Sequence, residues 1–180
     1  TNFPVFIDRE TAVTHHLAIL GVTGSGKSVF ARNLIRQIAD DDTKVICVDF
    51  TNEYGVNLAD LIGDSLVKGK DAESMFAAID KISHEMDKYS DKRNKSLIAS
   101  KEGELRDGFT AALTDFIASK DKAALFELPD VTNSAGILEY TKWFFKALFE
   151  LAKSTELDGK KICIVLEEAH TIVPEWNFLG

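Results

Sequence analysis

Residues 21–28 are Gly21-Val22-Thr23-Gly24-Ser25-Gly26-Lys27-Ser28, and they carry the strongest signal in the chain. It fits the pattern G-x-x-x-x-G-K-[ST], whose glycines allow a tight turn with backbone N–H groups pointing at phosphate oxygens. At these positions Lys27 is expected to reach the β- and γ-phosphates, and Ser28 to supply a hydroxyl to Mg²⁺. The alternative is a plain glycine-rich turn at a strand end. The pattern favours nucleotide binding.

The flanking sequence has the context that this motif requires, a strand before it and a helix after it. Residues 16–20 form a short aliphatic run and are predicted to be a strand. Residues 28–39 place Phe30, Leu34 and Ile38 at i, i+4 and i+8, which predicts an amphipathic helix. The loop is therefore expected to join a strand to a helix N-terminus, which adds partial positive charge for an anion.

Aliphatic runs and helical periodicity alternate along the rest of the chain. Continuous apolar runs are typical of parallel strands that helices cover on both faces. The expected fold is a three-layer α/β domain with a mainly parallel sheet. The predicted strands are residues 16–20, 45–50, 123–128 and Lys161–Leu166, with an edge strand at 5–7; the predicted helices are 28–39, 72–88, 108–119 and 137–153. We expect the last helix, which is rich in aromatic residues, to be heavily buried.

Composition indicates an ordinary globular chain of one domain. Its 180 residues are 45% hydrophobic, and a chain of this length can bury a core without disulfides. Cys47 and Cys163 lie inside aliphatic runs and are expected to act as small hydrophobic residues. No apolar stretch approaches the roughly 20 residues of a membrane span, so we expect a cytoplasmic protein with no membrane partner. The net charge of −8 argues against a uniform nucleic-acid coat, although not against DNA held by local basic loops.

Two carboxylates follow the last predicted strand. Glu167 and Glu168 come directly after the aliphatic run that ends at Leu166. In a P-loop enzyme, the first acid of such a pair holds Mg²⁺ through its water shell, and the second orients the attacking water. The alternative is that these acids start a helix, whose N-terminus favours negative charge. Beside the phosphate loop, we assign Glu167 to the metal and Glu168 to catalysis.

Two more acids, Asp49 and Glu53, follow the strand predicted at 45–50. Ligands of open α/β sheets bind at the carboxyl ends of strands, so both acids are candidates for the nucleotide site. Turn chemistry around Asn52 and Gly55 explains them equally well.

The order of these motifs resembles that of one family. Residues 16–28, then Asp49 with Glu53-Tyr54, then Glu167-Glu168-Ala169-His170 resemble the HerA branch of the HerA/FtsK P-loop ATPases. Members of this family have a RecA-like core and are Mg-ATP-driven hexameric translocases of double-stranded DNA. Some act with a nuclease, and bacterial relatives partner nuclease or sirtuin-like effectors in antiviral defence. The resemblance implies ATP and Mg²⁺ as cofactors, a homo-hexamer, double-stranded DNA and such an effector as partners.

The resemblance also implies roles for individual residues. Lys27, Glu167 and Glu168 are the expected catalytic residues, and Ser28 and Glu167 the expected metal-binding pair. Glu167 stands where many P-loop motors carry Asp. The residues expected to bind the nucleotide are Gly24, Ser25, Gly26, Lys27, Ser28, Val29, Asp49 and Glu53.

The expected domain organisation is an N-terminal strand or linker at 1–15 and an ATPase core at 16–180, with a helical insertion around 64–119. The family's sensor strand and the arginine supplied to a neighbouring subunit have no counterpart here. A sheet that ends at the strand before Glu167 would expose an apolar edge. We therefore expect the chain to be part of a longer protein, with low turnover alone because such an arginine contributes about 10³ to 10⁵ in kcat.

Two other functions compete with the motor. A nucleotide-gated scaffold for a partner effector would use the aromatic residues of 137–153 as an interface. A small-molecule P-loop kinase would need an arginine-rich lid, and the chain has no arginine after Arg106.

Overall fold

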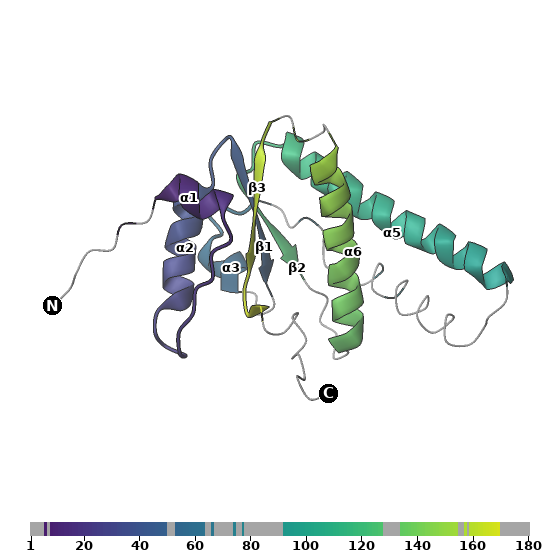
Figure 1. Ribbon diagram of the computed structural model, residues 1–180, viewed down its shortest axis with the longest axis horizontal. Coiled ribbons are helices and arrows are strands. Elements are labelled where there is room, and N and C mark those ends of the chain that lie inside the picture. Colours follow the sequence, from purple (N-terminus) through teal and green to yellow (C-terminus); the bar gives the residue numbers. More distant parts are fainter. Residues whose placement is uncertain are drawn as a thin grey trace.

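The computed structural model describes residues 6, 8–49, 53–63, 66, 74, 77, 92–127, 134–154, 157 and 159–169. One or two helices precede each strand along these residues (Figure 1). In chain order they are α1 (Arg9–Thr14), α2 (Lys27–Ile38), β1 (Thr43–Asp49), α3 (Glu53–Asn57), α5 (Lys92–Ala118), β2 (Ala123–Glu127), α6 (Ser134–Lys153) and β3 (Lys161–Leu166).

The described strands form one parallel sheet in the order β2-β1-β3. Val45 of β1 pairs with Ala123 of β2 on one side and with Cys163 of β3 on the other. The central strand is buried along its whole length. Three of the predicted strands, 45–50, 123–128 and Lys161–Leu166, are therefore confirmed within one or two residues.

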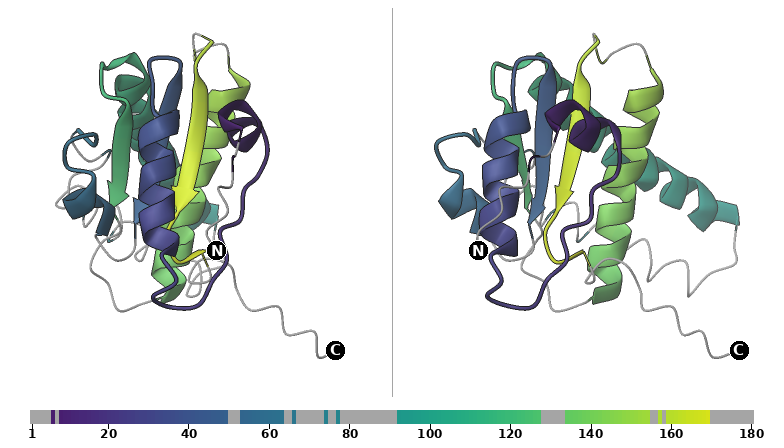
Figure 2. Two further views of the ribbon diagram at one scale, coloured as in Figure 1. Left: turned by 90° about the vertical axis from the view of Figure 1, so that its left-hand side faces the viewer. Right: turned by 60° about the vertical axis from the view of Figure 1, so that its left-hand side comes forward.

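Helices cover both faces of the sheet, so the predicted three-layer α/β arrangement is confirmed for the described residues. Successive side chains of a strand point to opposite faces. On one face Val45 and Cys47 pack with Ile35 of α2 and Leu58, which follows α3. On the other face the neighbouring residues of β1 and β2 pack against α5 and α6. Figures 1 and 2 show α2 and α3 on one side of the sheet and α5 and α6 on the other. This arrangement is compatible with a P-loop core.

Aromatic side chains fill the layer between the sheet and α5 and α6. Phe126 of β2 stacks on Phe144 of α6 with ring centroids 3.9 Å apart, and Phe109 of α5 meets Tyr140 edge-on at 5.3 Å. All four rings are at most 1% exposed. Burial of α6 is one-sided, however, because Phe149 remains 62% exposed. The expectation of a heavily buried helix holds for its sheet-facing side.

The strand predicted at residues 16–20 was wrong. These residues form no helix or strand, and Leu20 is 90% exposed. In both views of Figure 2 the dark purple segment runs from α1 to the start of α2 without joining the sheet. A strand exists only where a neighbouring strand pairs with it, and 16–20 pairs with no strand among the described residues. The aliphatic pattern indicates that a segment tends to be buried, but it does not indicate that a neighbouring strand is present to pair with it.

The burial predicted for the last strand is also wrong. Every residue of β3 is exposed or half-buried, including Ile164 and Leu166 at 36% and 38% exposure. Within the described residues β3 pairs with β1 alone, which leaves its side chains more exposed than those of β1.

Helix boundaries differ from the predictions at several places. Residues 9–14 were expected to be part of an N-terminal strand or linker, but they form helix α1. The Asp8 side chain caps this helix by accepting a hydrogen bond from Thr11 N. Helix α5 begins at Lys92, well before the predicted 108. Of the predicted edge strand at 5–7 the structure describes only Phe6, which is in neither a helix nor a strand. Most of the helix predicted at 72–88 and His170 lie outside the described residues.

Candidate nucleotide and metal site

The phosphate loop, residues 21–28, leads into the N-terminus of α2 through a backbone conformation that glycine adopts more easily than other residues. Gly24 and Gly26 have φ angles of +80° and +90°, in the left-handed region where other residues are strained. Gly26 is the N-cap of α2 and offers no side chain to the first N–H groups of the helix. These N–H groups and the helix dipole suit an anion. The geometry fits the role predicted for both glycines.

Contacts inside the loop close it into a compact turn. Ser25 N donates to Val22 O at 3.1 Å, and Lys27 Nζ donates to the same carbonyl at 3.2 Å. A Cβ at Gly21 would lie 2.5 Å from Ser25 Oγ, so a larger residue at this position would displace the Ser25 hydroxyl. Val29, in the first turn of α2, is 54% exposed. The Lys27 ammonium therefore folds back over the loop at the start of α2, and its contact with a phosphate stays a prediction.

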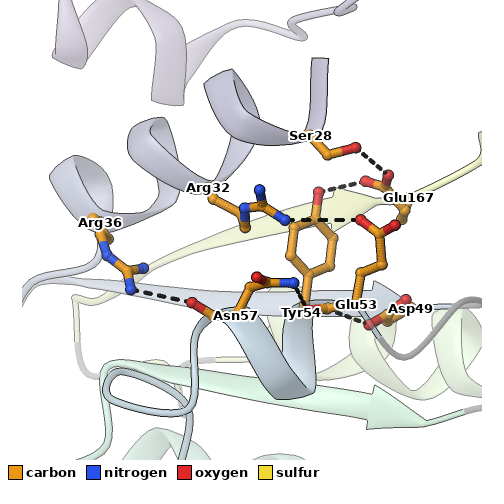
Figure 3. A network of polar contacts seen from close by, with 8 residues as sticks. All are labelled: Ser28, Arg32, Arg36, Asp49, Glu53, Tyr54, Asn57 and Glu167. Atoms are coloured by element: carbon orange, nitrogen blue, oxygen red, sulfur yellow. Dashed lines mark hydrogen bonds and ion pairs between the residues drawn. The ribbon is translucent and has the colours of Figure 1, made fainter. Parts of the chain in front are cut away.

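Glu167 lies at the carboxyl end of β3 and joins two distant parts of the chain. Its backbone N–H donates to Val48 O at 3.1 Å, which continues the pairing of β3 with β1. Its side chain accepts from Ser28 Oγ at 3.1 Å through Oε1 and from Tyr54 Oη at 2.5 Å through Oε2 (Figure 3). The structure thus brings together the two residues predicted to bind the metal.

Asp49 supports the start of α3. Its Oδ2 accepts from Tyr54 N at 2.7 Å, and the side chain is buried. Of the two interpretations that the sequence left open, this contact favours the local structural one. A contact between Asp49 and the nucleotide stays a prediction.

Glu53 lies on the exposed side of the same short helix. Its carboxylate is 3.8 Å from the Arg32 guanidinium of α2, and half of the Glu53 side chain is exposed. An exposed ion pair at this distance contributes little to stability. Glu53 therefore lies near the phosphate-loop helix, and nucleotide binding by Glu53 likewise stays a prediction.

Glu168 has a strained backbone. Its φ of +46° lies in the left-handed region, and it is the one non-glycine residue with positive φ among those described. The side chain is exposed. Such strain costs of order 1–3 kcal/mol and is concentrated at functional sites. The sharp turn directs the chain away from β3 immediately after Glu167.

The donor set fits Mg²⁺ bound together with a phosphate. Among the described residues there is no group of three or more His, Cys, Asp or Glu that could hold a metal ion by itself. Mg²⁺ is usually bound by one or two carboxylates together with phosphate oxygens and water. Ser28 and Glu167, beside the N-terminus of α2, supply what such a shared site needs.

Comparison with known proteins identifies the family. The family model described as "Helicase HerA, central domain" matches residues 1–94, which is more than half of the chain. The chain belongs to the HerA central-domain family. The matched HerA region includes the phosphate loop and Asp49 to Tyr54, and it ends before Glu167. The resemblance inferred from the sequence is thereby confirmed.

Two curated relatives match over short stretches. The probable DNA double-strand break repair helicase HerA of Methanocaldococcus jannaschii is 42% identical over 53 residues, which are 29% of this chain and 10% of the relative. The uncharacterized protein aq_aa31 of Aquifex aeolicus is 31% identical over 67 residues, 36% of this chain and 25% of the relative. The matches thus span a quarter or less of these relatives. No solved structure matches the chain.

Sequence reasoning missed one residue of the site, Tyr54. The tyrosine was noted only as part of the family motif, although its hydroxyl contacts Glu167 directly. An aromatic residue after a strand usually indicates core packing, so residue type alone gave no signal.

Helices of the described chain are too short or too polar to cross a membrane.

Proposed function

We propose that this chain is the Mg-ATP-binding and ATP-hydrolysing motor domain of a HerA-like homo-hexameric translocase of double-stranded DNA, acting with a nuclease or sirtuin-like effector. The observation that carries the proposal is the hydrogen bond between Ser28 and Glu167 beside the glycine-rich start of α2. Membership in the HerA central-domain family supports the assignment, as does the printed name of the archaeal relative, a DNA repair helicase.

Each residue has a distinct task in this proposal. The N–H groups of residues 24–28 bind the phosphates, and Lys27 neutralises their charge by turning from Val22 O toward the γ-phosphate. Ser28 and Glu167 hold Mg²⁺, which when bound would stabilise negative charge on the phosphate oxygens. Glu168 orients a water molecule and accepts its proton during attack. Its exposed position next to Glu167 leaves the carboxylate accessible to water.

ATP turnover by the full-length protein, with and without duplex DNA, tests the proposal. We expect DNA-stimulated turnover by the wild type and a loss of at least about 100-fold in Glu168→Gln, since a general base typically contributes 10² to 10⁴. Glu150→Gln, on the exposed side of α6, is the matched control and should leave turnover unchanged. Turnover that ignores DNA would contradict the translocase, and turnover that survives in Glu168→Gln would contradict the catalytic assignment.

The scaffold remains a second candidate because of an apolar groove between α6 and β3. The groove, of about 560 Å³, is lined by apolar residues that include Phe145, Phe149 and Ile164, together with Lys142 and Lys146. Exposed aromatic surface of this kind is enriched in protein interfaces. If Glu168→Ala abolished turnover but left the activity of a bound effector intact, the scaffold would be the better description.

A further inference from the structure

Tyr54 is a buried tyrosine whose hydroxyl reaches the site. The residue is 1% exposed, and its Oη donates to Glu167 Oε2 at 2.5 Å. Ser28 Oγ donates to the other oxygen of the same carboxylate, so Glu167 is held from two sides (Figure 3). The two donors come from different helices, α3 and α2.

The position of the phenol is fixed by contacts of α3 at both ends. At its start, the backbone N–H of Tyr54 donates to Asp49 Oδ2 of β1 at 2.7 Å. At its end, Arg36 of α2 donates to Asn57 O at 3.2 Å and to Asp60 at 2.7 Å. The short helix is therefore attached to the sheet and to α2, and the hydroxyl has little freedom to leave Glu167.

The chemistry of the pair fixes the direction of the hydrogen bond. The Tyr54 hydroxyl is the donor and the Glu167 carboxylate is the acceptor, because an ionised carboxylate carries no proton to donate. A donor on Oε2 leaves Oε1 as the oxygen directed toward Ser28 and the phosphate loop.

We infer that Tyr54 is a positioning residue that holds Glu167 in the orientation needed for Mg²⁺ when Ser28 leaves the carboxylate to bind the metal. The inference rests on the proposed function. Without a nucleotide, Ser28 and Tyr54 both hold the side chain. With Mg-ATP bound, the Ser28 hydroxyl would bind the metal, and Tyr54 would be the donor that still holds the Glu167 carboxylate.

Tyr54→Phe tests the inference, with Tyr140→Phe as the matched control. Tyr140 is also fully buried, and its hydroxyl has no hydrogen-bond partner within the described residues. Both variants delete one buried hydroxyl and keep the ring. The readout is the Mg²⁺ concentration that half-saturates binding of a fluorescent ATP analogue, measured together with the affinity for the analogue at saturating Mg²⁺.

We expect Tyr54→Phe to raise the half-saturating Mg²⁺ concentration about 10- to 100-fold, the usual effect of removing a group that orients a metal ligand. Affinity for the analogue at saturating Mg²⁺ should change little, and Tyr140→Phe should shift neither value. An unchanged Mg²⁺ requirement in Tyr54→Phe, while the wild type binds normally, would overturn the positioning role alone. Failure of the wild type to bind the analogue with Mg²⁺ would overturn the proposed function and this inference with it.

A folding measurement without nucleotide checks the contact itself. Unfolding of the wild type, Tyr54→Phe, Glu167→Ala and the double variant forms a double-mutant cycle, because alanine leaves no acceptor for the Tyr54 hydroxyl. Because a hydrogen bond to a charged group is strong, we expect coupling of at least about tenfold in the unfolding equilibrium constant. Additive effects would contradict the bond and overturn the inference.

Discussion

Ser28 and Glu167 are 139 positions apart in the chain, yet the Ser28 hydroxyl donates to Glu167 Oε1 at 3.1 Å. The contact joins the first turn of α2 to the end of β3. Because α2 packs on the face of the sheet that β1 and the neighbouring β3 share, the bond depends on the packing of α2 against the sheet. It connects the glycine-rich loop at the start of α2 with the acid that follows the last strand.

The first prediction concerns this bond. Ser28→Ala should remove the Mg²⁺-dependent part of ATP affinity and lower the free energy of unfolding by about 1 kcal/mol, the typical contribution of one hydrogen bond. Ser28→Thr keeps a hydroxyl at the same position and should retain both properties. Titration calorimetry with ATP, with and without Mg²⁺, and urea unfolding measure the two effects. An ATP affinity in Ser28→Ala that responds to Mg²⁺ as in the wild type would contradict the metal role.

The second prediction separates stability from catalysis at Glu168. Its φ of +46° is strained for a residue with a Cβ. Glu168→Gly should therefore raise the free energy of unfolding by about 1 kcal/mol, since the left-handed region costs roughly 1–2 kcal/mol for an L-residue. The same variant should lose ATP turnover. Glu168→Gln keeps the Cβ, so it should lose turnover without gaining stability. Equal stability of the two variants in urea unfolding would rule out relief of strain.

The third prediction compares Phe126 of β2, which packs against α6, with Phe149 of α6 itself. Phe126 is fully buried and stacked on Phe144, so Phe126→Ala should cost about 3–5 kcal/mol of unfolding free energy. Phe149 is 62% exposed and contacts Lys153, so Phe149→Ala should cost no more than about 1 kcal/mol. Denaturant unfolding monitored by circular dichroism gives both values. Similar losses would mean that the α6 layer is packed differently.

Sequence predicted the central part of this fold well, for a physical reason. The apolar runs that form β1 and β2 each pair with a neighbouring strand of the sheet. The local sequence pattern and the tertiary context therefore agree there. Residues 16–20 have the same kind of apolar pattern, but they pair with no strand among the described residues. The local sequence pattern cannot predict whether a partner strand is present. The motif order also predicted that Ser28 and Glu167 belong to one site, since the carboxyl ends of parallel strands share an edge.

Tyr54 could not be predicted in the same way. Its role depends on the 2.5 Å approach of its hydroxyl to Glu167, 113 positions later in the chain, and on the anchoring of α3 by Asp49. The sequence shows that Glu53 and Tyr54 are neighbours in the chain. It does not show that the ring of Tyr54 crosses the space between α3 and β3. Only the packing of α3 against β1 places the phenol there.

The last prediction uses the thiol of Cys47, which is fully buried in β1. Burial, with a smaller effect of the nearby Asp49, raises its pKa from 9.0 to about 12. In the unfolded chain the thiol loses its proton near pH 9, whereas the folded protein keeps it. The unfolded state then binds fewer protons, so the free energy of unfolding should fall between pH 9 and pH 12, by up to about 1.4 kcal/mol per pH unit.

Cys47→Val isolates this effect, because valine fills a similar volume and does not titrate. The difference in unfolding free energy between wild type and Cys47→Val should be constant below about pH 8 and should move against the wild type as the pH rises. Subtracting the variant removes the titration of all other groups. Alkylation followed by mass spectrometry gives an independent check, since Cys47 in the folded protein should react only through unfolding. Rapid alkylation of native Cys47 at pH 8, or a pH-independent difference between the two proteins, would show that the thiol is accessible and that its environment in β1 is not apolar.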